Sequence, residues 1–260
     1  MNTATEPESS PRGKYAVPAL EKALDVLEHL AEQAVPLTQA QLARALGREP
    51  GELFRMLNCL EARGYLRRND AGAYQLTLKL FELSRTHSPH EQLIEVATPL
   101  MRDLVDRVRQ SCHLTVLHRD QVLVLAQVES PQPVRLSVQV GSLHSPVTTV
   151  SGRLLLAQLP TAERTELLSR QPDYLRMDAA EKLEFAASLA RAHEEGWAYR
   201  EGARFIGGLD LGVPVGREGN RTRAALTIAA LKGPDGPDLF ELLPKLQQCA
   251  AEIARGCGLG

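Results

Sequence analysis

Four arginines, Arg55, Arg63, Arg67 and Arg68, stand out because their type and close spacing could bind an anionic partner. A guanidinium group is always charged and donates paired hydrogen bonds, so it binds phosphate oxygens and the edge of guanine. Residues 18–84 nevertheless contain 8 Lys and Arg against 9 Asp and Glu, so the positive charge is local. This pattern indicates a sequence-selective contact with nucleic acid rather than a general basic coat.

Two predicted helices and a hairpin position these arginines. Thr38 can cap a first helix, which Gly47 ends. Pro50 suits the first turn of a second helix, which Gly64 ends. Residues 65–76 then read as two short strands around a turn. Helix, turn, helix and hairpin in this order are typical of a winged helix-turn-helix, a mainly α domain with a small β wing.

A winged helix-turn-helix predicts a partner, double-stranded operator DNA. The second helix fits the major groove, where its outward side chains reach base edges, and the hairpin arginines meet phosphates or the neighbouring minor groove. The residues expected to contact DNA are Thr38, Gln39, Arg48, Gly51, Glu52, Arg55, Asn58, Arg63, Arg67 and Arg68. An ordinary helical hairpin used for packing is the alternative, but it gives no reason for the basic hairpin.

Composition sets the outer bounds. A length of 260 residues and a hydrophobic content of 43% predict two domains with real cores. No apolar run approaches the roughly 18 residues of a membrane-spanning helix, and residues 1–17 are polar and read as a disordered tail. The four cysteines are widely spaced without a CxxC pair, which favours a reduced, cytoplasmic protein.

The pattern changes after residue 89. Helices are expected over residues 90–109, 151–158, 161–170, 179–195 and 238–255, and strands over 113–118, 121–128, 134–140, 197–199, 209–215 and 223–231. Long helices flanking a mostly antiparallel sheet make this an α+β domain, and such sheets commonly hold a small-molecule pocket. The predicted organisation is a tail (1–17), a winged helix-turn-helix (18–77), a linker helix (78–88) and an effector-binding domain (89–260).

Several segments together resemble one known family. The chain reads LTQAQLARALG from residue 37, FRMLNCLEARGYLRR from 54, VSGRLLLAQL from 150, GWAYREG from 196, LGVPV from 211 and AALTIAAL from 224. In order and spacing, residues 18–258 resemble the IclR family of bacterial transcriptional regulators. The resemblance implies a repressor or activator with a GAF-like effector domain, and effector domains that join dimers into tetramers. The dimer itself is expected because two recognition helices must reach half-sites, and the apolar helices at 19–32 and 78–84 could pair chains.

The resemblance also implies a pocket for a small organic acid or aromatic metabolite. Its matching residues are Val150, Ser151, Gly152, Ile206, Pro214, Thr227 and Ala229. The chain departs from the family at two places. Arg204 stands where the family commonly has an acidic residue, and it could clamp a carboxylate. Gly51-Glu52 stands where the family often has Ser-Thr, which predicts an unusual operator preference.

Other chemistry has weaker support. The glycine-rich residues 202–208 lack the ends of a P-loop or Rossmann turn, and Ser151 lacks a GxSxG elbow. Cys112 and His113 have no well-spaced further ligands, so no metal and no cofactor are expected. The sequence therefore predicts a regulator and not an enzyme. The alternative is a GAF-like signalling or enzymatic module that uses the N-terminal helices for assembly only.

Overall fold

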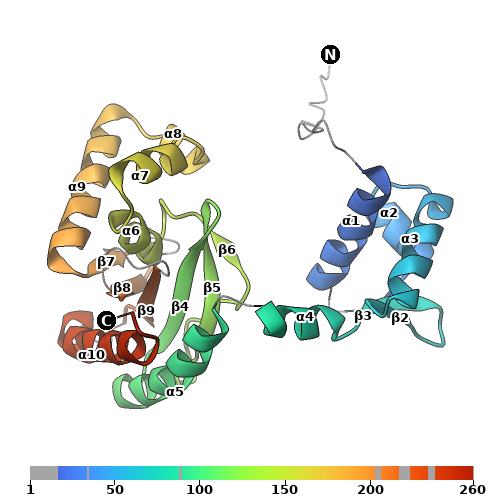
Figure 1. Cartoon of the computed structure of the whole chain (residues 1–260). Helices are drawn as coiled ribbons and strands as arrows, with labels where there is room; N and C mark the ends of the chain where they lie inside the picture. Colours follow the sequence, from blue (N-terminus) through green and yellow to red (C-terminus); the bar gives the residue numbers. More distant parts are fainter. Residues whose placement is uncertain are drawn as a thin grey trace. The chain divides into compact units, whose positions relative to one another are not determined.

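The computed structural model describes residues 17–33, 35–87, 90–202, 206–216, 223–233 and 238–259. The chain divides into two compact units, residues 1–88 and 89–260 (Figure 1). Residues 1–16 of the expected tail, and Arg204, lie outside the described residues. All four cysteines are free thiols. No helix in the described ranges is long and apolar enough to cross a membrane.

The N-terminal unit is a helix-turn-helix with a small sheet. Its elements are α1 (Pro18–Glu32), β1 (Leu37–Thr38), α2 (Gln39–Ala45), α3 (Pro50–Ala62), β2 (Leu66–Arg68), β3 (Ala73–Leu76) and α4 (Lys79–His87). The strands form an antiparallel sheet in the order β1-β3-β2. Leu42, Leu53, Leu57 and Tyr74 are almost completely buried in its core. The expected winged helix-turn-helix is therefore present, with β2 and β3 as the wing.

Helix α1 buries only part of its apolar surface. Val26, Leu27 and Leu30 are buried, whereas Leu20 is 55% and Leu24 is 45% exposed. The helix packs against α3 and β3 along one stripe, and a helical stripe covers only about a third of the circumference. A second apolar stripe therefore stays on the surface of this unit.

The C-terminal unit is an α+β domain around one antiparallel sheet. Its elements are α5 (Glu91–Val108), β4 (Ser111–His118), β5 (Gln121–Val128), β6 (Leu143–His144), α6 (Val150–Ala157), α7 (Thr161–Leu168), α8 (Pro172–Leu175), α9 (Ala179–Glu195), β7 (Ala198–Glu201), β8 (Gly208–Val215), β9 (Ala224–Leu231) and α10 (Leu239–Gly256). The strand order is β6-β5-β4-β9-β8-β7. Figure 1 shows α5 and α10 on one face and α6 to α9 on the other.

The two faces of this sheet differ in chemistry. Cys112, Leu114 and Val116 alternate along β4 with Ser111, His113 and Thr115, and all six are buried. The apolar series joins the core that α5 and α10 cover. Because successive side chains of a strand point to opposite faces, the polar series lies on the α6 side of the sheet.

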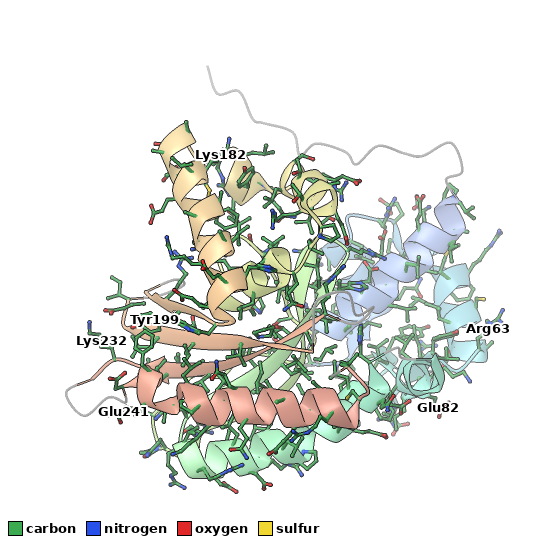
Figure 2. The ribbon with its side chains drawn as sticks, turned by 60° about the vertical axis from the view of Figure 1, so that its left-hand side comes forward. Arg63, Glu82, Lys182, Tyr199, Lys232 and Glu241 are labelled. Carbon is green, nitrogen blue, oxygen red and sulfur yellow. The ribbon has the colours of Figure 1, made fainter. Side chains whose placement is uncertain are left out.

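The aromatic side chains at the far edge of the sheet pack on α10. The ring centroids of Trp197 and Tyr199 lie 5.4 and 5.0 Å from that of Phe240. Figure 2 shows Tyr199 and Lys232 at this end of the sheet, beside Glu241 in the first turn of α10. These contacts anchor the start of the last helix.

The strand predicted over residues 134–140 is wrong. Leu143–His144 pairs with β5 in its place. Residues 134–140 run without a strand partner, and the Val138 N–H donates to the side-chain oxygen of Gln127 at 2.6 Å. An alternating pattern does not specify a strand partner. Here Leu136 and Val138 are half-buried beside a cavity, whereas Val134 and Val140 are 73% and 55% exposed.

Candidate DNA-contacting surface and effector cavity

The outward side of α3 is the strongest candidate for reading DNA. The helix starts at Pro50, and Leu53, Leu57 and Leu60 face the core. Gly51, Arg55 and Asn58 are exposed on the opposite side. None of the described residues forms an ion pair with Arg55. Phe54 is also 52% exposed, although it was not among the expected contact residues.

Four of the expected contact residues already hold the helix-turn-helix together. Thr38 caps α2 by accepting from the Gln41 N–H at 3.4 Å. The Gln39 side-chain nitrogen donates to the Pro50 carbonyl at 2.7 Å. The remaining two form ion pairs with α1, namely Glu52 with Lys22 at 2.8 Å and Arg48 with Asp25 at 3.4 Å.

The wing and the end of α3 add three exposed cations. Arg63 lies at the C-cap of α3, and Figure 2 shows it at the outer margin of this unit. Arg67 and Arg68 lie on β2. The Arg68 guanidinium lies 5.5 Å from the centroid of Tyr74 and donates to the Gly72 carbonyl at 3.3 Å. Gly72 has a φ of +76°, which only glycine adopts without strain.

The C-terminal unit contains a cavity of about 310 Å³ above the polar side of the sheet. It is lined by His113, Thr115, Val124, Leu136, Ser137, Val138, Gln139, Ser142, His144, Thr149, Val150, Ser151, Asp210, Thr227 and Ala229. Its floor comes from β4, β5, β8 and β9, one end from the start of α6, and another wall from residues 136–142. The size falls in the usual range of about 300–1,000 Å³ for small-molecule sites.

The predicted pocket residues separate into two groups. Val150, Ser151, Thr227 and Ala229 line the cavity. The prediction is wrong for three residues that do not line this cavity, namely Gly152, Ile206 and Pro214. Arg204 lies outside the described residues.

Each of the three corrections has a physical reason. Gly152 lies so close to the Pro146 backbone that a Cβ would collide with it, so this glycine lets α6 approach the preceding loop. The side chain of Ile206 is fully exposed. Pro214 borders a different groove, beside Ala250 and Ala254 of α10.

The centre of the cavity floor carries a buried hydroxyl without a partner. Thr227 on β9 is only 1% exposed, and its Oγ1 has no hydrogen-bond partner among the described residues. The neighbouring Thr115 hydroxyl, in contrast, donates to the Ala225 carbonyl at 3.3 Å. A buried hydroxyl without a hydrogen bond is unfavourable, so Thr227 is suited to bind a polar atom of a ligand.

The titratable groups of the cavity were also missed. Burial, with a smaller effect of nearby His144, lowers the pKa of His113 to about 4, so its imidazole is neutral at pH 7. His144 Nε2 lies 2.8 Å from the Ser142 hydroxyl. Asp210 supplies a carboxylate from β8. The alternation Ser111-x-His113-x-Thr115 within a buried strand is the sequence signal that could have found this wall.

A cation faces Asp210 from the next strand. Arg200 on β7 is the direct register partner of Asp210, and such partners have Cβ atoms about 5 Å apart. The Arg200 guanidinium donates to the Thr148 carbonyl at 3.1 Å, next to the cap of α6. Within the described ranges, no three His, Cys, Asp or Glu side chains gather as a metal site would require.

Comparison with known proteins agrees with both halves of this arrangement. Residues 19–70 match the family profile of the IclR helix-turn-helix domain. Residues 87–255 match the profile of the bacterial transcriptional regulator IclR C-terminal domain. The chain thus combines a winged helix-turn-helix with an effector domain in one transcriptional regulator. It belongs to the IclR family, and the alternative of a signalling or enzymatic module is discarded.

Individual relatives cover nearly the whole chain. The glycerol operon regulatory protein of Streptomyces griseus is 28% identical over 94% of this chain and 98% of its own length. The probable transcriptional regulator SauR of Cupriavidus necator is 28% identical over 90% of this chain and 94% of its own.

Two solved structures share the fold. The IclR homolog of Microbacterium hydrocarbonoxydans, complexed with 4-hydroxybenzoate, has a TM-score of 0.79 at 23% identity and covers 93% of this chain and 100% of its own. Thermotoga maritima IclR has a TM-score of 0.72 at 20% identity and covers 92% of this chain and 98% of its own.

Proposed function

We propose that a small organic acid or aromatic metabolite binds in the cavity and thereby controls the affinity of this regulator for operator DNA. The observation that carries the proposal is the Thr227 hydroxyl, which is buried at the cavity floor and has no partner in the described chain. A ligand changes the DNA affinity only if it binds the conformation of the protein that can bind DNA with a different affinity from the conformation that cannot.

The start of α6 favours an anionic group. The first N–H groups of a helix have no partner within it and carry partial positive charge. The Gly152 N–H donates to the Thr149 hydroxyl at 3.1 Å, which leaves those of Val150 and Ser151 for a ligand. Arg200, opposite Asp210, offsets the negative charge that would otherwise oppose a carboxylate.

The remaining walls favour a flat, partly apolar ligand. Val124, Leu136, Val138 and Val150 supply aliphatic surface, while Thr227 and the neutral His113 supply hydrogen-bonding groups. The 4-hydroxybenzoate bound by the Microbacterium homolog combines a ring, a carboxylate and a hydroxyl. That ligand is a reasonable first probe for this chain, without being assigned as its effector.

Calorimetry and DNA anisotropy on the full chain test this proposal. The screen covers small carboxylates and aromatic acids, including 4-hydroxybenzoate and benzoate. The neutral 4-hydroxybenzyl alcohol is the uncharged control. We expect at least one acid to bind, to change operator affinity and to raise the melting temperature by mass action.

Thr227→Val should weaken the binding of that acid roughly fivefold to tenfold, because one hydrogen bond contributes about 1–1.5 kcal/mol. Thr98→Val, on α5 outside the cavity, is the matched control. Equal affinity for wild type and Thr227→Val would contradict the assigned site.

We further propose that α3 lies in the major groove of operator DNA in the bacterial cytoplasm, with Arg55 and Asn58 at base edges. Arg63, Arg67 and Arg68 then contact the phosphate backbone. The exposure of all five supports this arrangement. A sequence-preferring, salt-sensitive mobility shift is the expected result. Its absence with and without effector would contradict this arrangement.

A dimer follows from the need to reach two half-sites. The exposed apolar stripe of α1, with Val17, Leu20 and Leu24, and exposed Leu80 and Leu83 of α4 are the proposed pairing surface. Leu20→Glu with Leu24→Glu should shift sedimentation toward the monomer. Leu175→Glu, at an equally exposed leucine on α8, should leave the state unchanged. Pairing of dimers into tetramers through the effector domains is a further proposal, which the same sedimentation run tests.

A further inference from the structure

Helix α1 forms two ion pairs of opposite sense, one with Glu52 in the first turn of α3 and one with Arg48 in the turn before α3. Lys22 and Asp25 lie about one helical turn apart on α1. The Lys22 Nζ is 2.8 Å from the Glu52 carboxylate, and the Asp25 carboxylate is 3.4 Å from the Arg48 guanidinium. Thus α1 holds one anion and one cation that flank the start of α3.

We propose that Lys22 is a specificity-determining residue for DNA binding, acting by withdrawing Glu52 from the DNA. Glu52 lies in the first turn of α3, and its side chain remains 45% exposed despite the pair. A free carboxylate there would repel phosphate and would accept a hydrogen bond from cytosine N4. Bound to Lys22, it is neutralised and held toward α1. The proposal rests on the proposed docking of α3 in the major groove.

The surroundings of Glu52 explain why this withdrawal changes what is read. Gly51, the residue before it, has no side chain, and nothing lies within 4 Å of where a Cβ would be. With Glu52 held back, the first turn of α3 presents no hydrogen-bonding side chain to a base, because Pro50 is apolar and Gly51 has none. Base reading therefore falls to Arg55 and Asn58, which are exposed further along the helix.

The Lys22 side chain is itself only 22% exposed, so it is placed to act on Glu52 rather than to extend into solvent. The hydrogen bond from Lys22, and then its charge, lower the pKa of Glu52, which agrees with a carboxylate held in its ionised form. An exposed ion pair of this kind contributes little to folding stability. The main consequence of the pair is therefore for DNA binding.

The second pair provides a control of opposite sign. Asp25→Asn should free Arg48, a cation that can then contact phosphate, and raise DNA affinity about twofold to fivefold. Lys22→Met should free the anion Glu52 and lower affinity about threefold to tenfold. If the two pairs only stabilised the fold, both variants would weaken binding.

The deciding experiment is a double-mutant cycle with the full chain on a duplex that wild-type protein selects from a random library. Lys22→Met, Glu52→Gln and their combination are titrated by anisotropy, with Lys22→Arg as the conservative variant. Lys245→Met on α10 changes the net charge equally in the other unit. We expect the loss of DNA affinity in Lys22→Met to vanish in the Glu52→Gln background, and Lys22→Arg to retain the wild-type affinity. We also expect the duplexes that Lys22→Met selects from the random library to contain a cytosine that wild type does not select.

Equal losses in both backgrounds would overturn the inference, because Lys22 would then contact DNA itself. No loss, or an unchanged base preference in Lys22→Met, would also overturn it. Arg55→Ala separates this failure from failure of the proposed docking. If Arg55→Ala weakens specific binding while Lys22→Met does not, only the role of Lys22 is lost, whereas no effect of Arg55→Ala removes the docking itself.

Discussion

The candidate DNA-contacting surface and the candidate effector cavity are built in opposite ways. The surface comes from one continuous stretch, residues 38–68, and its buried face is apolar. The cavity is assembled from side chains that run from His113 to Ala229 across five strands, a helix start and an irregular segment. The first depends on local geometry, and the second depends on strand register.

The two regions also treat their polar groups differently. On the surface, Glu52 and Arg48 each form an ion pair with a residue of α1, so the charges of these two side chains are compensated within the protein. In the cavity, the Thr227 hydroxyl is buried without a partner in the described chain and His113 is held neutral. The first region therefore has two of its charged side chains paired within the protein, whereas the second leaves a buried hydroxyl without a hydrogen bond among the described residues.

Arg55→Ala is expected to have the largest effect. If Arg55 reads a base edge, its loss weakens specific binding by about 1–3 kcal/mol, or roughly fivefold to 150-fold. The measurement is anisotropy on the selected duplex and on random DNA. Arg102→Ala, on α5 of the other unit, serves as the charge control. An equal loss on random DNA would reassign Arg55 to the phosphate backbone and weaken the contrast between reading surface and cavity.

Acidification should act on the cavity unit rather than on the DNA surface. The pKa of His113 is lowered from 6.5 to about 4 in the folded chain. The unfolded chain therefore binds more protons between these values, so stability is full above pH 6.5 and falls as the pH falls toward 4. The expected loss from pH 7 to pH 5 is about 2 kcal/mol.

Denaturant unfolding at both pH values measures this loss, and His113→Gln should remove most of it. An equal pH dependence in wild type and His113→Gln would show that other groups dominate acid unfolding. The stability of the cavity unit would then be no more sensitive to acid through His113 than that of the unit with the DNA-contacting surface.

Arg67→Ala should have the smallest effect. A phosphate contact by the wing contributes without regard to sequence, so selected and random duplexes should weaken alike. The slope of log affinity against log salt should fall in magnitude by about 1. A loss confined to the selected duplex would instead mean that the wing reads the minor groove.

The sequence predicted the elements whose determinants are local. Thr38 with Gln41 and Asp178 with Glu181 form capping boxes at the starts of α2 and α9. Gly196 ends α9 in the left-handed conformation, with a φ of +70°. Each signal depends on residues within about one turn of one another, so it can be read without knowing the fold.

The errors arose where a pattern has two physical causes. Residues 134–140 alternate in sequence without pairing as a strand, and only residues 136–139 of this segment line the cavity. The family resemblance placed Ile206 and Pro214 in the pocket, yet Ile206 is exposed before β8 and Pro214, on β8, borders a different groove.

The sequence by itself determined the two-unit organisation and the helix-turn-helix, because helical periodicity and caps act over a few residues. Only the tertiary structure decided that Glu52 and Arg48 are paired with α1, and that His113, Thr227 and Asp210 share one cavity. Those contacts join residues far apart in the chain, and they depend on helix packing and on the registers of β4, β9 and β8. A sequence pattern does not specify such registers, because each strand alternates in the same way whichever neighbour it pairs with.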